Sequence, residues 1–113
     1  MKTYTVTQAR EHLHVLIYEA STGDEIGIQV FGRPYVRLSK RAPNLLTSPT
    51  PLLVRVEEAK DEWSQLLSAV ANNDARFFFV SPHDIEVYLL RIDGYRNNFL
   101  NIWEAHKRRF YED

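Results

Sequence analysis

The sequence predicts an α+β protein made of two tandem β-α-β-β modules and a C-terminal amphipathic helix. VTQAREHLHVLI, which begins at Val6, has a counterpart in VEEAKDEWSQLL, which begins 50 positions later at Val56. From Ala9 to Ala20 and from Ala59 to Val70, apolar residues recur at steps of four, three, one and three, which is the spacing of one buried helix face. Each segment also follows one strand-like run and precedes two others, so the repeat covers a whole structural unit.

The first module covers residues 1–41. KTYTV predicts its first strand, and Thr7 is the expected N-cap because its hydroxyl can accept a free backbone N–H of the first turn. The helix should end near Gly23, since glycine readily takes the left-handed conformation that ends helices. Alternating apolar residues then predict a half-buried strand, and the Gly-Arg-Pro sequence at 32–34 predicts a turn into the returning strand YVRLS. The expected buried positions are Ala9, Leu13, Leu16, Ile17, Ala20, Ile26, Ile28 and Val30.

Residues 42–51 contain three prolines and predict a linker, because proline removes backbone donors and blocks helix formation. Residues 52–92 then repeat the order of elements. LLVRV is the expected first strand, RFFFVS and IEVYLLRI are the expected hairpin strands, and PHD is the turn between them. The expected buried face of the second helix consists of Ala59, Trp63, Leu66, Leu67 and Val70.

Residues 93–113 predict a final helix with Asp93 as its N-cap and basic residues in its last turns, where cations complement the helix dipole. One face of this helix is aromatic and too apolar to remain in water. This face either binds a partner, which we favour, or packs on the second module. The predicted partner-binding residues are Tyr95, Phe99, Ile102, Trp103, His106 and Phe110.

Charge is divided unevenly along the chain. The net charge is −1, but residues 1–41 carry +2 and residues 52–92 carry −3. A whole-chain basic nucleic-acid binder is therefore excluded, while the first module remains compatible with a phosphate backbone. Four carboxylates at the start of the second helix would repel such a backbone. These carboxylates belong to Glu57, Glu58, Asp61 and Glu62.

The sequence carries no pattern typical of catalysis. There is no cysteine, and His12 and His14 are two positions apart on a helix, so they point to different faces and do not share a metal. Neither a glycine-rich phosphate loop nor a nucleophile elbow is present. We therefore expect a protein that is not an enzyme and that has no metal site and no cofactor.

Apolar runs in the sequence are short. None approaches the roughly 20 residues that a membrane-spanning helix needs. The first residues, MKTYTVTQ, lack the apolar stretch of a secretory signal. We therefore expect a cytoplasmic protein without membrane contact.

Residues 3–39, TYTVTQAREHLHVLIYEASTGDEIGIQVFGRPYVRLS, resemble the Phd/YefM-type antitoxins of bacterial toxin–antitoxin systems. The resemblance rests on the helix start with Thr7, Ala9 and Arg10, on Leu13 with the apolar doublet that follows it, and on the Gly-basic-Pro turn. From about residue 52 to residue 92 the second module is similar in its skeleton only, with Trp63 in the place of leucine.

The resemblance implies a small module that dimerises through its sheet and helices, binds operator DNA through its N-terminal region and wraps a toxin with its C-terminal segment. We therefore expect an antitoxin that neutralises a cognate toxin and represses its own operon. Its two modules should form a pseudo-dimer within one chain, and further association into a homo-oligomer stays open. The DNA-binding residues that the resemblance predicts are Lys2, Thr7, Arg10 and Arg33.

The chain departs from the family pattern at several places. Val30 and Phe31 stand where the family usually carries basic residues, and a second module replaces the family's next helix. Two alternatives therefore remain open, namely a protein-interaction module without a toxin and a DNA-binding regulator of the same fold. The acidic second helix favours an antitoxin or an interaction module over a regulator.

Overall fold

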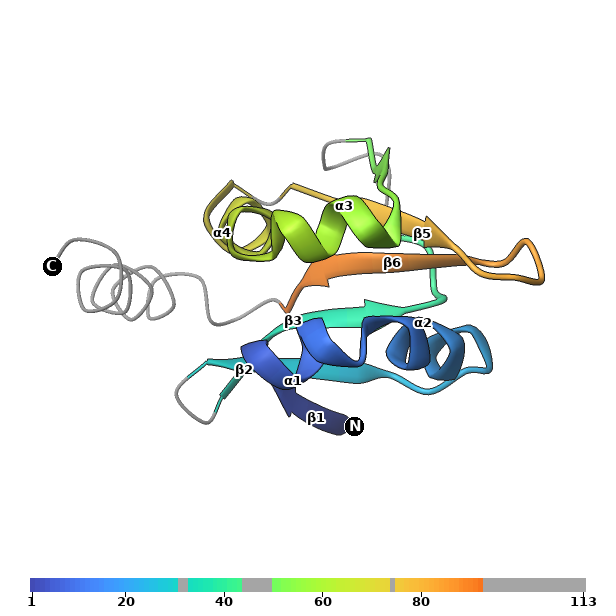
Figure 1. Cartoon of the computed structure of the whole chain (residues 1–113), viewed down its shortest axis with the longest axis horizontal. Coiled ribbons are helices and arrows are strands. Elements are labelled where there is room, and N and C mark those ends of the chain that lie inside the picture. The colour runs from blue at the N-terminus through green and yellow to red at the C-terminus, as the bar shows by residue number, and fades with distance from the viewer. Residues whose placement is uncertain (31–32, 44–49, 74, 93–113) are drawn as a thin grey trace, which may run out of the picture.

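The described part of the chain places four helices on one face of a six-stranded mixed β-sheet (Figure 1). The computed structural model describes residues 1–30, 33–43, 50–73 and 75–92. The first half contributes β1 (Lys2–Thr5), α1 (Val6–Glu11), α2 (Leu13–Ser21), β2 (Ile26–Val30) and β3 (Arg33–Ser39). The second half contributes β4 (Leu52–Leu53), α3 (Val56–Asp61), α4 (Trp63–Asn73), β5 (Phe77–Val80) and β6 (Glu86–Arg91). The expected α+β class is confirmed.

The strands are arranged in the order β1-β2-β3-β6-β5-β4, and Figure 1 shows β1, β2, β3, β6 and β5 following one another across the sheet. In each half the first strand pairs in parallel with the second, and the second pairs antiparallel with the third. The third strands of the two halves, β3 and β6, pair antiparallel with each other at the centre of the sheet. From either edge to the centre of the sheet, the first, second and third strands of one half therefore follow one another in that order.

The pairing register is also the same in the two halves. Ile26 pairs with Lys2 on one side and with Leu38 on the other. Phe77, 51 positions later, pairs with Leu52 on one side and with Leu89 on the other. Val56–Leu67 is helical and follows a strand, as the internal repeat requires.

Each half contains two helices where the sequence predicts one. The break falls at His12 (φ −112°, ψ 24°) in the first half and at Glu62 (φ −113°, ψ 26°) in the second. Helical hydrogen bonds reach each break residue from both sides. The N–H of His12 donates to the carbonyl of Gln8 at 3.0 Å, and the carbonyl of His12 accepts from the N–H of Leu16 at 3.0 Å. Glu62 makes the equivalent bonds with Glu58 at 3.0 Å and with Leu66 at 2.9 Å. The breaks therefore bend the helix without interrupting its buried face.

The first helix begins two residues before the expected position. The Thr5 hydroxyl accepts from the N–H of Gln8, and the Gln8 side chain accepts from the N–H of Thr5, each at 3.1 Å. This capping box satisfies two backbone donors at the helix start. Thr7, the predicted N-cap, lies inside α1, because β1 ends at Thr5 and the chain turns there.

The second half starts its helix differently. Arg55 is the N-cap of α3 and makes no capping hydrogen bond with its side chain. The first turn instead carries Glu57 and Glu58, whose negative charges favour the positive end of the helix dipole. The two halves thus reach the same helix start by different interactions.

Gly23 ends α2 as expected. Its φ of +114° lies where residues with a side chain are strained. The N–H of Gly23 donates to the carbonyl of Ala20 at 3.1 Å, and the N–H of Asp24 donates to that of Glu19 at 3.3 Å. These two bonds form a Schellman motif, which satisfies carbonyls left free at the helix end.

The first hairpin turn is shorter than predicted. Arg33 and Pro34 already belong to β3 and pair with Val30 and Gln29 of β2. A register shift between Ile28 and Gln29 lets the pairing continue to the end of β2, and proline is tolerated near the first residue of a strand. Gly32 lies outside the described residues.

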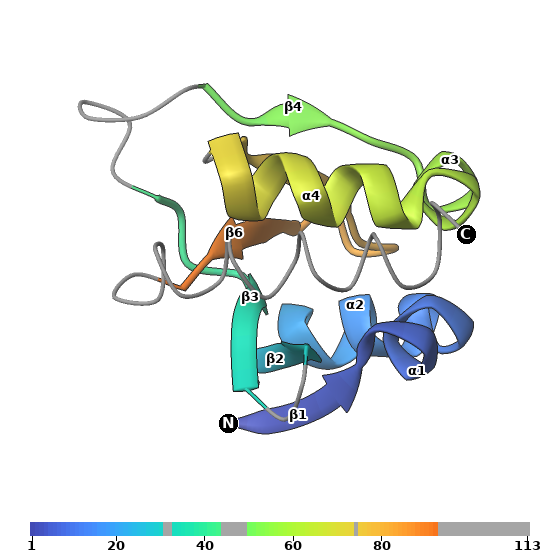
Figure 2. The same cartoon turned by 90° about the vertical axis from the view of Figure 1, so that its left-hand side faces the viewer.

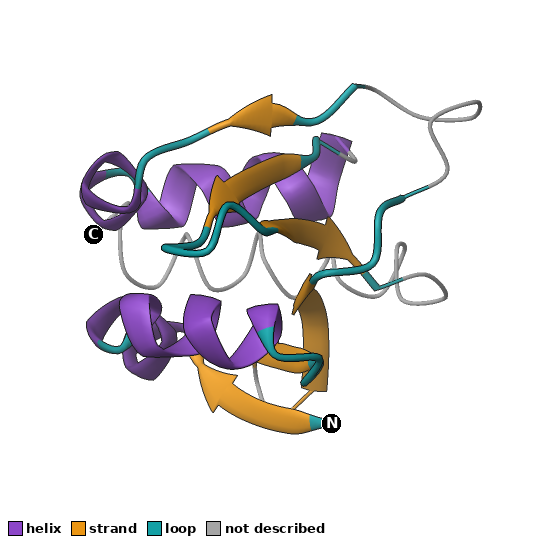
Figure 3. Cartoon of the chain, turned by 90° about the vertical axis from the view of Figure 1, so that its right-hand side faces the viewer, coloured by secondary structure: helices purple, strands orange, loops and turns teal. Residues whose placement is uncertain are grey.

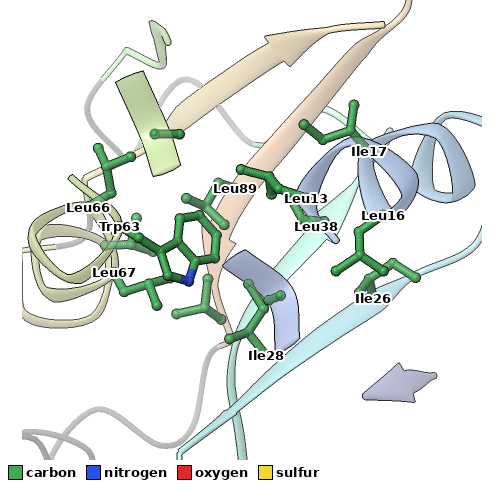
Figure 4. Close-up of a cluster of buried hydrophobic side chains, with 14 of the residues drawn as sticks. Leu13, Leu16, Ile17, Ile26, Ile28, Leu38, Trp63, Leu66, Leu67 and Leu89 are labelled. Atoms are coloured by element: carbon green, nitrogen blue, oxygen red, sulfur yellow. The ribbon is translucent and has the colours of Figure 1, made fainter. Parts of the chain in front are cut away.

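One hydrophobic core joins the two halves, whose helices are stacked along the same face of the sheet (Figure 3). Every helix position that the sequence predicts as apolar is buried, and Ile26 and Ile28 are buried as well. Leu38 and Leu89 lie between the side chains of α2 and those of α4 (Figure 4). Both of these helices contact both central strands, so neither half completes its core alone.

The capping box yields a first test. Thr5→Ala should lower the free energy of unfolding by about 1 kcal/mol, because a helix N-cap loses its acceptor. Thr7→Ala is the matched control and should change stability little, since Thr7 is exposed within α1 and alanine favours helices. Urea denaturation of the two variants measures the difference. A larger loss for Thr7→Ala would contradict the assigned cap.

Candidate functional site

The helices of the two halves meet at a seam that contains two hydrogen bonds between distant parts of the sequence. The indole N–H of Trp63 donates to the carbonyl of Val6 at 3.0 Å. The Nε of Arg10 donates to the carbonyl of Lys60 at 2.8 Å. Trp63 is buried and Arg10 is exposed, so the seam runs from the core to the surface.

The seam is asymmetric although the backbone is repeated. Leu13 stands 50 positions before Trp63 and has no polar atom to donate across the seam. Arg10 and Lys60 themselves occupy equivalent positions, and Arg10 is the donor to the backbone of Lys60. The contact therefore joins α1 to the end of α3 and the start of α4.

The predicted DNA-binding residues come from three elements of the fold, β1, α1 and β3. Lys2 lies at the start of β1, where its Nζ is 3.7 Å from a carboxylate oxygen of Glu19 and 3.5 Å from one of Asp24. The nearby charges of Glu19 and Asp24 raise the pKa of Lys2. Two carboxylates thus offset the positive charge of this lysine.

The other three predicted residues have different surroundings. Arg10 binds the carbonyl of Lys60, and Thr7 is exposed on α1. Arg33 lies on β3, where its backbone pairs with Val30 at the far end of the first hairpin. Contact with one DNA duplex would therefore need surfaces from several elements.

A surface hollow of about 560 Å³ lies beside the seam. It extends from Arg10 and the α3–α4 junction along the outer side of α4. Trp63 and Ala69 supply apolar surface, and Asp61 and Glu62 supply negative charge. The remaining lining residues are Lys60, Ser64, Gln65, Ser68 and Asn73.

Short side chains create this hollow. Ser64, Ser68 and Ala69 line the outer side of α4. The equivalent positions of α2, 50 residues earlier, carry the larger side chains of His14, Tyr18 and Glu19. Tyr18 is 52% exposed, and Val15, which is equivalent to Gln65 of the hollow, is 54% exposed. The same helix face is therefore hollow in the second half and filled by protruding side chains in the first.

The outer face of the sheet also differs between the halves. In the second half the rings of Phe78 and Tyr88 lie 6.1 Å apart, and Leu53 and Val80 are exposed beside them. The Tyr88 hydroxyl donates to the Glu86 carboxylate, which together with burial raises the pKa of Tyr88 to about 12. The equivalent positions of the first half are polar or small: Thr3, Gly27, Gln29 and Arg37.

The six predicted partner-binding residues, from Tyr95 to Phe110, lie outside the described residues. Within the described ranges, no group of three or more His, Asp or Glu side chains is placed to hold a metal ion. The same part of the chain contains no helix with the length and apolar character that crossing a membrane requires.

Comparisons of the chain with models of known protein families, with curated proteins and with solved structures found no match.

Sequence reasoning missed both features of this site. The spacing of apolar residues marks the buried helix face, but it carries no information on which backbone carbonyl Trp63 or Arg10 reaches. The hollow had a weak signal in the sequence. Ser64 and Ser68 are small, polar and four positions apart, so they lie on one helix face.

The seam yields a second test. Trp63→Phe should lower the free energy of unfolding by about 1 kcal/mol beyond any packing change, because it removes the N–H donor and keeps an aromatic ring. Trp63→Leu copies the residue of the first half and should cost more, since it also leaves unfilled space. Equal stabilities of wild type and Trp63→Phe would show that the hydrogen bond to Val6 contributes nothing.

Proposed function

We propose that the protein is an antitoxin, which neutralises a cognate toxin by protein–protein binding. The observation that carries this proposal is the sheet itself. Two β-α-α-β-β halves with the same register pair through β3 and β6. The resembled family dimerises through its sheet and helices, and the arrangement supports a pseudo-dimer of Phd/YefM-like modules in one chain.

Fusion of two modules has a physical advantage. A separate dimer must bring two chains together and dissociates on dilution. Two modules on one chain meet at a high effective concentration, so their association does not depend on protein concentration. The single core shared by α2, α4 and the two central strands is what such a fusion requires.

Operon repression is the secondary part of the proposal, and it rests on the first half alone. The charge of +2 over residues 1–41 favours contact with DNA. The ion pairs of Lys2, the contact between Arg10 and Lys60, and the acidic start of α3 all weaken such contact. Toxin binding is therefore the better supported activity, ahead of a DNA-binding regulator. A protein-interaction module without a toxin remains the alternative.

Toxin neutralisation can be tested by co-expressing the chain with the product of the adjacent gene and purifying the complex. Phe99→Ala and Trp103→Ala should each weaken that complex by about 2 kcal/mol or more, because buried aromatic anchors dominate binding energy. Thermal melts of the free variants provide the control. Lower melting temperatures with unchanged affinity would assign the aromatic face to the protein's own core. Absence of any complex would favour the interaction module without this toxin.

DNA binding can be tested by gel shift with the operon's own promoter. Arg10→Ala should weaken binding and reduce its salt dependence by about one phosphate contact, whereas Lys60→Ala should have little effect. Arg10→Ala should also cost about 1 kcal/mol of stability through the lost bond to Lys60, so binding is compared well below the melting temperature. Equal losses for the two variants would contradict the assignment to the first half, and no shift at low salt would remove repression from the proposal.

A further inference from the structure

We propose that the hollow beside α4 is the docking site for residues 93–113 of the same chain. This inference does not depend on the protein being an antitoxin, and a toxin that binds the aromatic face of the segment would have to displace it from the hollow. The first reason is where the segment begins. β6 ends at Arg91, and the N–H of Ile92 donates to the carbonyl of Tyr35 at 2.9 Å, so the chain leaves the centre of the sheet.

The register of the sheet places this exit beside the end of α4. Leu89 of β6 pairs with Phe77, the first residue of β5. Phe77 follows the last residue of α4, Asn73, by only four positions. Figure 2 shows the end of β6 on the same side of the molecule as the end of α4. The segment therefore starts at one end of the hollow, near Asn73.

The length of the segment matches the length of the hollow. The lining residues run from Lys60 to Asn73 along α3 and α4, which corresponds to roughly 20 Å at the helical rise of about 1.5 Å per residue. The sequence predicts that 93–113 forms a helix, and the distance from Tyr95 to Arg108 on such a helix is also roughly 20 Å. A helix that starts beside Asn73 thus reaches the α3–α4 junction with its basic residues.

The charges at that junction are complementary to those of the segment. Asp61 and Glu62 line the hollow at the junction, and Glu57 and Glu58 lie on the first turn of α3. The cations in this region are Arg10, Lys60 and the N-cap residue Arg55, so the carboxylates are in excess by one. The end of the segment carries three consecutive cations at 107–109. The aromatic face of the segment would meanwhile cover Ala69 and the short side chains of α4. The acidic start of the second module, which disfavours DNA, is explained by this contact within the chain.

A spin label provides a direct test in the full-length protein. The chain has no cysteine, so a nitroxide on Gln65→Cys labels one site. Paramagnetic broadening should remove the NMR amide signals around Trp103. A label on Asn73→Cys should remove the signals around Tyr95 instead, because the proposed arrangement places Tyr95 beside Asn73. Val15→Cys is the matched control, since it is exposed at the equivalent position of the first half.

Two results would overturn the proposal. One is equal broadening of the signals of 93–113 by the labels at 15 and 65. The other is no broadening of these signals by either of the labels at 65 and 73. Asp61→Lys combined with Glu62→Lys should largely restore the signals around Trp103, because the basic end of the segment loses its partner. Glu11→Lys, at the position equivalent to Asp61, should leave the broadening unchanged. Unchanged broadening in the Asp61/Glu62 variant would remove the charge contact from the proposal and leave docking by apolar contact alone.

Discussion

The antiparallel pairing of β3 with β6 is the contact on which the rest of the fold depends. It places Leu38 opposite Leu89 and brings both halves under the same set of helices. Because α2 and α4 each pack on both central strands, the apolar face of either helix is covered partly by the other half. The seam contacts of Trp63 and Arg10 follow from this geometry, since they require α1 to lie beside the α3–α4 junction.

The two halves keep one backbone and present different surfaces. The differences between them include many exposed positions, while most buried positions are apolar in both halves and vary in size, as Leu13 and Trp63 illustrate. The second half has the hollow, the acidic helix start and the aromatic outer sheet face. The first half has protruding Tyr18 and Val15 and the positive balance of charge. In a symmetric dimer every surface occurs twice, whereas here each surface occurs once.

The sequence allowed the buried helix faces to be predicted, because their spacing follows directly from the helical repeat. The position of the first N-cap was wrong by two residues, although Thr5 and Gln8 carry the spacing of a capping box. The helix breaks at His12 and Glu62, and the seam bonds, depend on packing between distant segments and have no local signal. The contacts of Lys2 with Glu19 and Asp24, and of Arg10 with the carbonyl of Lys60, also had no local signal, and DNA binding through these residues stays a prediction. The partner-binding residues from Tyr95 to Phe110 stay a prediction.

The unlike helix starts give the two halves unlike responses to ionic strength. Thr5 and Gln8 hold the start of α1 by short hydrogen bonds between neutral groups, which dissolved salt hardly affects. Glu57 and Glu58 act on the start of α3 through charge across solvent, and at 1 M salt the screening length falls to about 3 Å. Rising salt should therefore destabilise the first turn of α3 more than the first turn of α1. The two helix starts, which have the same backbone fold, should differ in how readily they unfold locally.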